Sequence, residues 1–172
     1  MIIALLLLAG AAASSSETSI LAQLSAGKML CSNPDPATKT CSAISSYVHG
    51  ENDSFVETSE ILLPAPQPLT LQLSAAARIK GSTICGIMSE ADLQKGLVRV
   101  NGSLLQPEQN ARAMGTLIEK LRPMAGRQAC EELRIEGGVL MKYGQVEQVD
   151  LKLPGKPVRW ISTADGYTVS PR

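Results

Sequence analysis

The chain has 172 residues with 16 basic and 16 acidic side chains, so its formal net charge at pH 7 is zero. Hydrophobic residues make up 44% of the chain and aromatic residues 3%, which predicts one domain with a core of Leu, Ile, Val, Ala and Met. No run of like charge appears, and this excludes the basic footprint of a nucleic-acid-binding protein.

The N-terminus is typical of a secretory signal peptide over residues 1–13. Residues 2–8 are apolar, and small residues follow up to Ala13, where we expect cleavage. The apolar run is shorter than the roughly 20 residues that span a bilayer, so no membrane anchor is expected after cleavage. No Lys or Arg precedes the run, which departs from the usual pattern and leaves a buried core helix as the alternative. We predict an exported protein, periplasmic or secreted.

Four cysteines in an exported chain predict two disulfides. Three pairings are possible, and we expect Cys31–Cys41, which closes a short turn, and Cys85–Cys130, which closes the contiguous block 81–136. The chain lacks the Cys-x-x-Cys spacing of a thioredoxin-like redox site and the close cysteine pairs of a zinc knuckle. Neither a metal nor another cofactor is expected.

Residues 14–26 are predicted to form a loosely ordered leader or one short helix, and residues 27–172 a single domain. In the first half of that domain, strands are predicted where β-favouring or alternating residues lie between turns: 27–31, 41–48, 55–63, 69–73 and 83–85. The first three of these strands are expected to form an antiparallel meander. The proline-rich residues 64–68 are interpreted as a stiff linker.

Two helices are predicted in the centre of the chain. Ser89 and Asp92 match a capping box, Met88 and Leu93 match a hydrophobic staple, and Gly96 is expected to end this short helix. The main amphipathic helix begins at Pro107 and ends or kinks at Pro123, with a further turn expected at 127–130. Its apolar stripe consists of Ala111, Met114, Leu117, Ile118 and Leu121.

Two hairpins follow from the glycine turns. Asn101–Gly102 predicts a type I′ turn between strands 97–100 and 103–105. For strands 133–135 and 139–143, a two-residue turn would place Leu133 opposite Lys142. We therefore expect a three-residue loop that pairs Leu133 with Met141. With final strands at 146–153 and 158–162, the predicted class is α+β, in which antiparallel meander and hairpin strands pack with one main helix and a short capped helix.

The residues that could carry chemistry form no complete catalytic set, so no catalytic residue is assigned. His49, the single histidine, is interpreted as a loop residue, because a nucleophile and an orienting acid cannot be recognised beside it. Glu131 and Glu132 are adjacent, but neighbours on a strand point to opposite faces, and we interpret both as solvated. Asn52 and Asn101 begin N-glycosylation sequons that also match turn chemistry, which we favour.

Several stretches give the chain a family resemblance: the export leader, GKMLC, CSAISSY, GENDSF, TICGI and RWISTADGY. Together they resemble small exported proteins of Gram-negative, proteobacterial type that carry no assigned activity. The resemblance implies a periplasmic location and carries over no catalytic residue.

The leading hypothesis is a non-enzymatic, exported domain that binds a protein or envelope component. It depends on the export signal, the expected disulfides and the lack of a complete catalytic set. The alternatives are a small secreted hydrolase, which would use scattered carboxylates or His49, and an inhibitor of a secreted hydrolase.

Overall fold

The computed structural model describes residues 20–51, 54–147, 149–152 and 154–171. The predicted signal peptide and the sequon residue Asn52 lie outside these residues. Strands account for 49% of the structure, and none of the described helices has the length and apolar character to cross a membrane. The helices are α1 (Ile20–Ser25), α2 (Glu90–Gln94) and α3 (Pro107–Leu121), with the 3-10 turns η1 (Arg122–Met124) and η2 (Thr163–Asp165).

Thirteen strands are assigned in the described residues. In the first half of the chain they are β1 (Met29–Ser32), β2 (Thr40–Cys41), β3 (Ala43–His49), β4 (Phe55–Leu63), β5 (Leu69–Lys80) and β6 (Thr83–Ile87). In the second half they are β7 (Leu97–Val100), β8 (Ser103–Leu104), β9 (Gln128–Glu136), β10 (Val139–Val146), β11 (Val149–Lys152), β12 (Lys156–Ile161) and β13 (Thr168–Val169).

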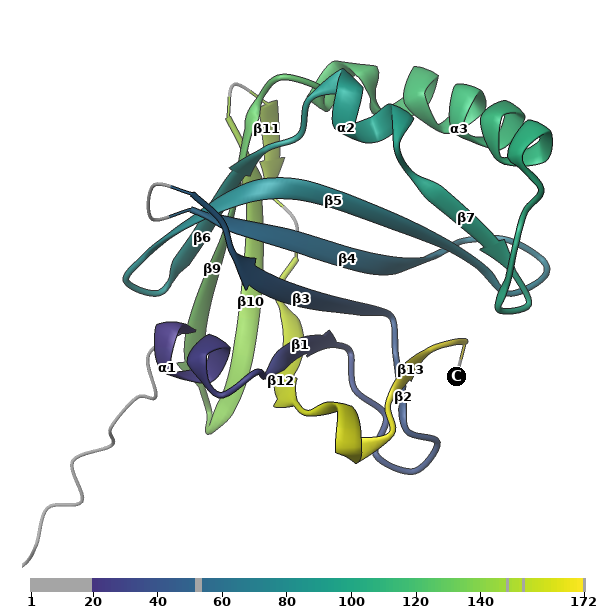
Figure 1. The fold of residues 1–172 in the computed structure, drawn as a ribbon. Coiled ribbons are helices and arrows are strands. Elements are labelled where there is room, and N and C mark those ends of the chain that lie inside the picture. Colours follow the sequence, from purple (N-terminus) through teal and green to yellow (C-terminus); the bar gives the residue numbers. More distant parts are fainter. Residues whose placement is uncertain (1–19, 52–53, 148, 153, 172) are drawn as a thin grey trace, which may run out of the picture.

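Eight antiparallel strands close into a barrel (Figure 1). Around the ring they follow the chain in the order β1, β3, β4, β5, β6, β9, β10 and β12, and the pairing of β1 with β12 closes the ring. The expected antiparallel strands and single long helix are confirmed, but the meander and hairpins do not remain an open sheet. Closure joins Met29 to Ile161, near the two ends of the domain, and no local sequence pattern reports such a distant pairing.

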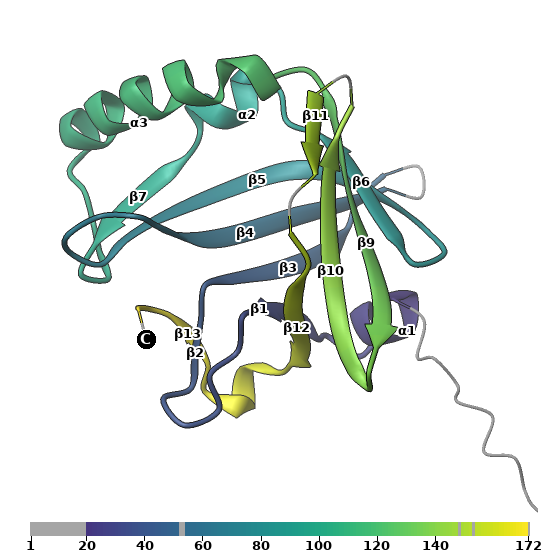
Figure 2. The same cartoon turned by 180° about the vertical axis from the view of Figure 1, so that it is seen from behind.

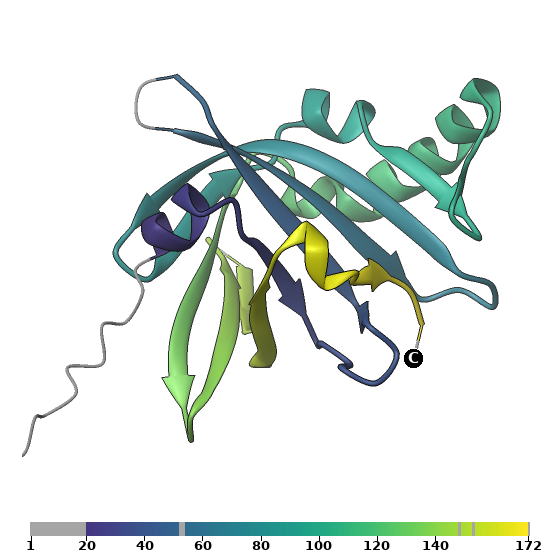
Figure 3. The ribbon, with the colours of Figure 1, turned by 60° about the horizontal axis from the view of Figure 1, so that its bottom comes forward.

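Apolar side chains fill one end of the barrel, because alternate residues of each strand point into it. Helix α1 covers this end and packs Ile20 and Leu24 against the lumen (Figures 2 and 3). The short helix that was one of two alternatives for the leader therefore has a packing role. The lumen residues of this core are Leu30, Ala77, Ile84, Leu133 and Val158.

At the other end, α2 and α3 pack on an extension of the sheet (Figure 1). Strand β5 is long enough to pair with β7 along its first residues and with β6 along its last. Its inward face continues under the helices, where the buried residues are Leu71, Leu73, Leu93, Val98 and Met114. The capping box of Ser89 and Asp92 and the Pro107 helix start are found as predicted. Ala111 is exposed, however, and Ala113 takes its place in the packing.

Both disulfides have the predicted pairing. Cys31–Cys41 joins β1 to β2 and is completely buried, with Ile161 and Tyr167 packed around it. Cys85–Cys130 joins directly opposed residues of β6 and β9, with Cα atoms 4.1 Å apart, on the outer face of the barrel. Two disulfides are compatible with an extracellular or periplasmic protein.

Two further local predictions are wrong. Residues 128–130 belong to β9 rather than to a helical turn. The hairpin between β9 and β10 has a two-residue turn, Gly137–Gly138, with positive φ at both glycines, and it pairs Leu133 with Lys142. The prediction assumed that Lys142 would point to solvent, whereas its side chain is only 12% exposed. At the other predicted turn, Asn101 and Gly102 both have the positive φ of a type I′ turn, as expected.

Candidate functional site

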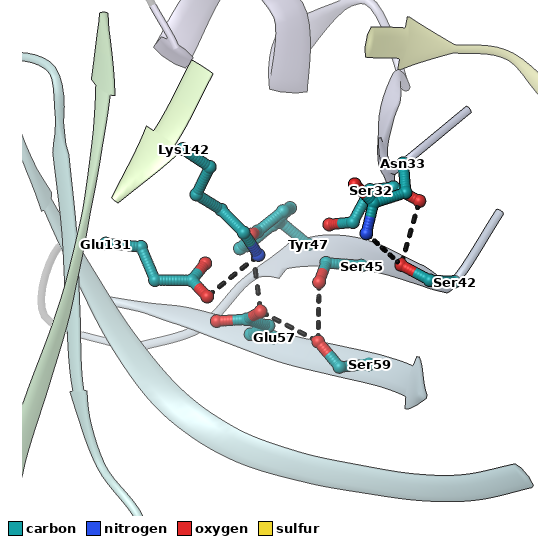
Figure 4. A network of polar contacts seen from close by, with 9 residues as sticks. All are labelled: Ser32, Asn33, Ser42, Ser45, Tyr47, Glu57, Ser59, Glu131 and Lys142. Carbon is teal, nitrogen blue, oxygen red and sulfur yellow. Dashed lines mark hydrogen bonds and ion pairs between the residues drawn. The ribbon is translucent and has the colours of Figure 1, made fainter. Parts of the chain in front are cut away.

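A charged cluster occupies the middle of the barrel lumen (Figure 4). Glu57 is contributed by β4, Glu131 by β9 and Lys142 by β10, and all three point inward because they share the faces of the lumen core residues. Figure 4 shows the ammonium group of Lys142 pointing toward both carboxylates. The Nζ of Lys142 lies 2.8 Å from Oε1 of Glu131.

Hydroxyl groups from β3 and β4 surround the Glu57 carboxylate. Its Oε1 accepts hydrogen bonds from Ser59 Oγ at 2.8 Å and from Tyr47 Oη at 3.3 Å. Ser45 extends this network, with its Oγ 2.6 Å from that of Ser59. Glu131 is less well satisfied, since its Oε2 is buried and has no hydrogen-bond partner in the described residues.

The electrostatics of the cluster favour a proton on Glu57. Burial, and then the negative charge of Glu131, raise the pKa of the Glu57 carboxyl, against the opposing effects of the Ser59 hydrogen bond and of the Lys142 charge. Burial and the same two carboxylates raise the pKa of Tyr47 as well, so its hydroxyl stays a hydrogen-bond donor. Full ionisation would leave two negative charges facing one positive charge, although the Glu131 side chain is 33% exposed and its charge is partly screened by solvent.

The candidates considered from sequence lie in different places. His49 is exposed at the end of β3, where its ring contacts Phe55 with centroids 4.5 Å apart. Glu131 and Glu132 do point to opposite faces, but only Glu132 is on the outside, beside Arg134. The interpretation of Glu131 as solvated is therefore wrong. One further carboxyl has a shifted pKa: Asp165 lies in η2, where hydrogen bonds donated by Ser162 lower the pKa of its carboxyl.

A groove on the outer surface is the second feature. Its volume is about 490 Å³. The outer faces of β3, β4 and β5 form its floor, with Arg99 and Gly102 from the β7–β8 hairpin and β13 also lining it. The lining includes apolar groups from Met29 and Ile44 and the ring of Tyr167.

Polar side chains at the floor of this groove form a connected set. Thr70 Oγ1 donates a hydrogen bond to Glu60 Oε1 at 2.7 Å, and Arg99 Nε lies 3.9 Å from the same oxygen. Arg99 Nη2 donates to Gln72 Oε1 at 3.3 Å. A guanidinium group has five N–H donors, so Arg99 retains hydrogen-bonding capacity toward a ligand. Glu60 and Arg99 together leave the groove close to electrical neutrality.

Sequence reasoning missed Glu57, Lys142, Glu60 and Arg99. One signal was present for Glu57, because it alternates with Phe55 and Ser59 on one face of a strand that was predicted with its correct bounds. The groove had no comparable signal, because β13 and the β7–β8 hairpin, which also line it, are distant along the chain from the floor strands β3, β4 and β5. Within the described residues, no group of three or more His, Cys, Asp or Glu side chains could hold a metal ion.

Comparison of the chain with protein families, with curated proteins and with solved structures finds no match in any of the three.

Proposed function

We propose that this protein is an exported, non-enzymatic domain that binds a protein or envelope component, and that the outer groove is its binding surface. The observation that carries the proposal is the composition of the groove. It sets apolar groups beside Glu60, Arg99 and Gln72, whose polar atoms already hold one another in place. Preorganised polar groups next to apolar surface are typical of ligand sites.

The two disulfides support the part of the proposal that concerns export. A periplasmic or secreted domain works in an oxidising compartment, where Cys31–Cys41 persists. That disulfide packs against Tyr167, which lines the groove. One wall of the groove is thus packed against a buried disulfide.

The test compares an Arg99→Ala variant with wild type and with Arg134→Ala as the matched control. Arg134 also contacts carboxylates, Glu132 and Glu136, but lies outside the groove. The probes are peptidoglycan sacculi, vesicles of phosphatidylethanolamine with phosphatidylglycerol, and an immobilised array of random heptapeptides. We expect one probe class to bind wild type and Arg134→Ala alike and to bind Arg99→Ala at least tenfold more weakly. If no probe binds, or if binding is insensitive to Arg99→Ala, the proposal is wrong.

One observation favours a second function, a small secreted hydrolase. Glu57 and Glu131 point toward each other in the lumen, and a carboxyl with a raised pKa has the property required of a general acid. A panel of chromogenic ester, phosphoester and glycoside substrates tests this function. Turnover by wild type that Glu57→Gln abolishes would replace the binding proposal with an enzymatic one.

A further inference from the structure

The C-terminal strand β13 has one unpaired edge. It runs parallel to β2. Thr168 N–H donates a hydrogen bond to the carbonyl oxygen of Lys39, just before β2, and Ser170 N–H donates to that of Cys41. Successive residues of a strand point their backbone groups to alternate sides, so the N–H and C=O of Val169 point away from β2. Among the described residues, β2 is the one strand with which β13 pairs.

This unpaired edge borders the groove. Thr168 and Val169 both line it, whereas neither residue of β2 does, so the edge opposite β2 lies on the groove side. Unpaired strand edges are templates for the addition of another strand. A segment laid along β13 would cover the groove floor around Thr58 and Glu60.

The charge and polarity of the groove select among possible occupants. Glu60 and Arg99 offset each other, so the groove favours no strongly charged ligand. Ile44 and Glu60 are directly opposite residues on β3 and β4, so an apolar and a polar floor group lie one strand spacing apart. An extended, uncharged polypeptide segment fits this surface, because every second side chain faces the floor and two successive ones can be an apolar and a hydrogen-bonding group.

We propose that the groove binds an extended segment of a partner protein, which pairs its backbone with Val169 as an added strand. The segment presents an apolar side chain toward Met29, Ile44 and Tyr167, and a hydrogen-bonding side chain toward Arg99 and Glu60. This inference rests on the proposed function, since it names the kind of partner that the same groove takes.

The test uses heptapeptides selected from the random array on the full chain, with affinities measured by calorimetry. Each backbone amide of a selected peptide is N-methylated in turn, which removes one N–H donor. Val169 offers one free C=O, so strand addition predicts that methylation of one backbone amide weakens binding at least tenfold while the amides on either side of it tolerate methylation. Val169→Pro removes the donor on the protein side and should abolish binding, whereas Val169→Ala, the matched control, should retain it.

The outcomes separate this inference from the proposed function. If peptides bind in an Arg99-dependent manner but no single amide is sensitive to methylation and Val169→Pro is tolerated, strand addition is wrong and groove binding stands. If only sacculi or vesicles bind in an Arg99-dependent manner, the occupant is not a polypeptide and this inference alone fails. If no probe binds at all, both proposals fail.

Discussion

In the lumen one ammonium group faces two carboxylates, so the protonation of Glu57 decides whether the middle of the barrel carries a net negative charge. A neutral side chain at position 57 leaves Lys142 paired with Glu131, so no buried charge loses its only partner and the desolvation of one ion is avoided. The three hydroxyl-bearing residues around Glu57 can bond to an amide as well as to a carboxyl group. An ionised Glu57 is therefore expected to contribute little stability beyond what a glutamine at this position would contribute.

The raised pKa of Glu57 makes stability depend on pH in a definite direction. A carboxyl whose pKa is higher in the folded than in the unfolded state binds its proton more tightly when folded. Its favourable contribution is complete below the ordinary value of 4.5 and is lost as pH rises through the folded pKa. The free energy of unfolding of Glu57→Gln, measured by urea denaturation from pH 4 to 9, should therefore increase relative to wild type as pH rises.

The control for this prediction is Glu119→Gln on the exposed side of α3. It removes the same charge from the surface and should track the wild-type pH profile. A Glu57→Gln profile parallel to that of wild type would show that the lumen does not perturb this carboxyl.

At the scale of elements, the local signals were reliable where neighbours along the chain decide the structure. Strand β4 has the predicted bounds, and the cap at Ser89, the start at Pro107 and the Asn101–Gly102 turn are all found. These features depend on hydrogen bonds or φ values within a few residues. They required no knowledge of the rest of the fold.

The local sequence patterns failed where the burial of a side chain depends on other strands of the barrel. The register of the β9–β10 hairpin was inferred from the polarity of Lys142, but a partner on the next strand, Glu131, makes that side chain an interior one. In the same way, the pairings of β1 with β12 and of β13 with β2 join segments that lie at opposite ends of the domain sequence. Neither the lumen cluster nor the groove could be predicted, because both exist only through these pairings.

Replacement by alanine is expected to have opposite effects on stability at two glycines, Gly115 in α3 and Gly86 in β6. Gly115 lies within α3, and a Cβ placed there would meet no atom within 4 Å. Gly115→Ala should stabilise the protein by about 0.5–1 kcal/mol through helix propensity. At Gly86 in β6, a Cβ would lie 2.8 Å from the backbone carbonyl oxygen of Ala76, so Gly86→Ala should destabilise by about 1–3 kcal/mol.

Urea denaturation of the two glycine variants at one pH measures both effects. Equal and small changes would mean that the β5–β6 pair shifts easily to admit a methyl group. A destabilised Gly115→Ala would mean that this face of α3 is covered in solution.

At the scale of the whole molecule, the two disulfides constrain different parts. Cys85–Cys130 spans 45 residues and links neighbouring barrel strands on the outer face, whereas Cys31–Cys41 spans 10 residues and is buried beneath the C-terminal segment. In the chain-entropy model the longer loop contributes about 4 kcal/mol and the shorter about 3 kcal/mol. For the groove, the Cys31–Cys41 disulfide matters more than Cys85–Cys130, because the groove residue Tyr167 packs against Cys31 and Cys41.

We therefore expect the two double variants to separate stability from binding. Cys85→Ala with Cys130→Ala should lower the free energy of unfolding by about 4 kcal/mol and leave peptide affinity within twofold of wild type. Cys31→Ala with Cys41→Ala should lower it by about 3 kcal/mol and weaken peptide binding at least tenfold, since loss of the buried sulfurs loosens the support of Tyr167 and β13. Non-reducing urea denaturation and calorimetry measure the two quantities. Equal loss of affinity in both variants would mean that the groove depends on the barrel as a whole and not on the packing beneath β13.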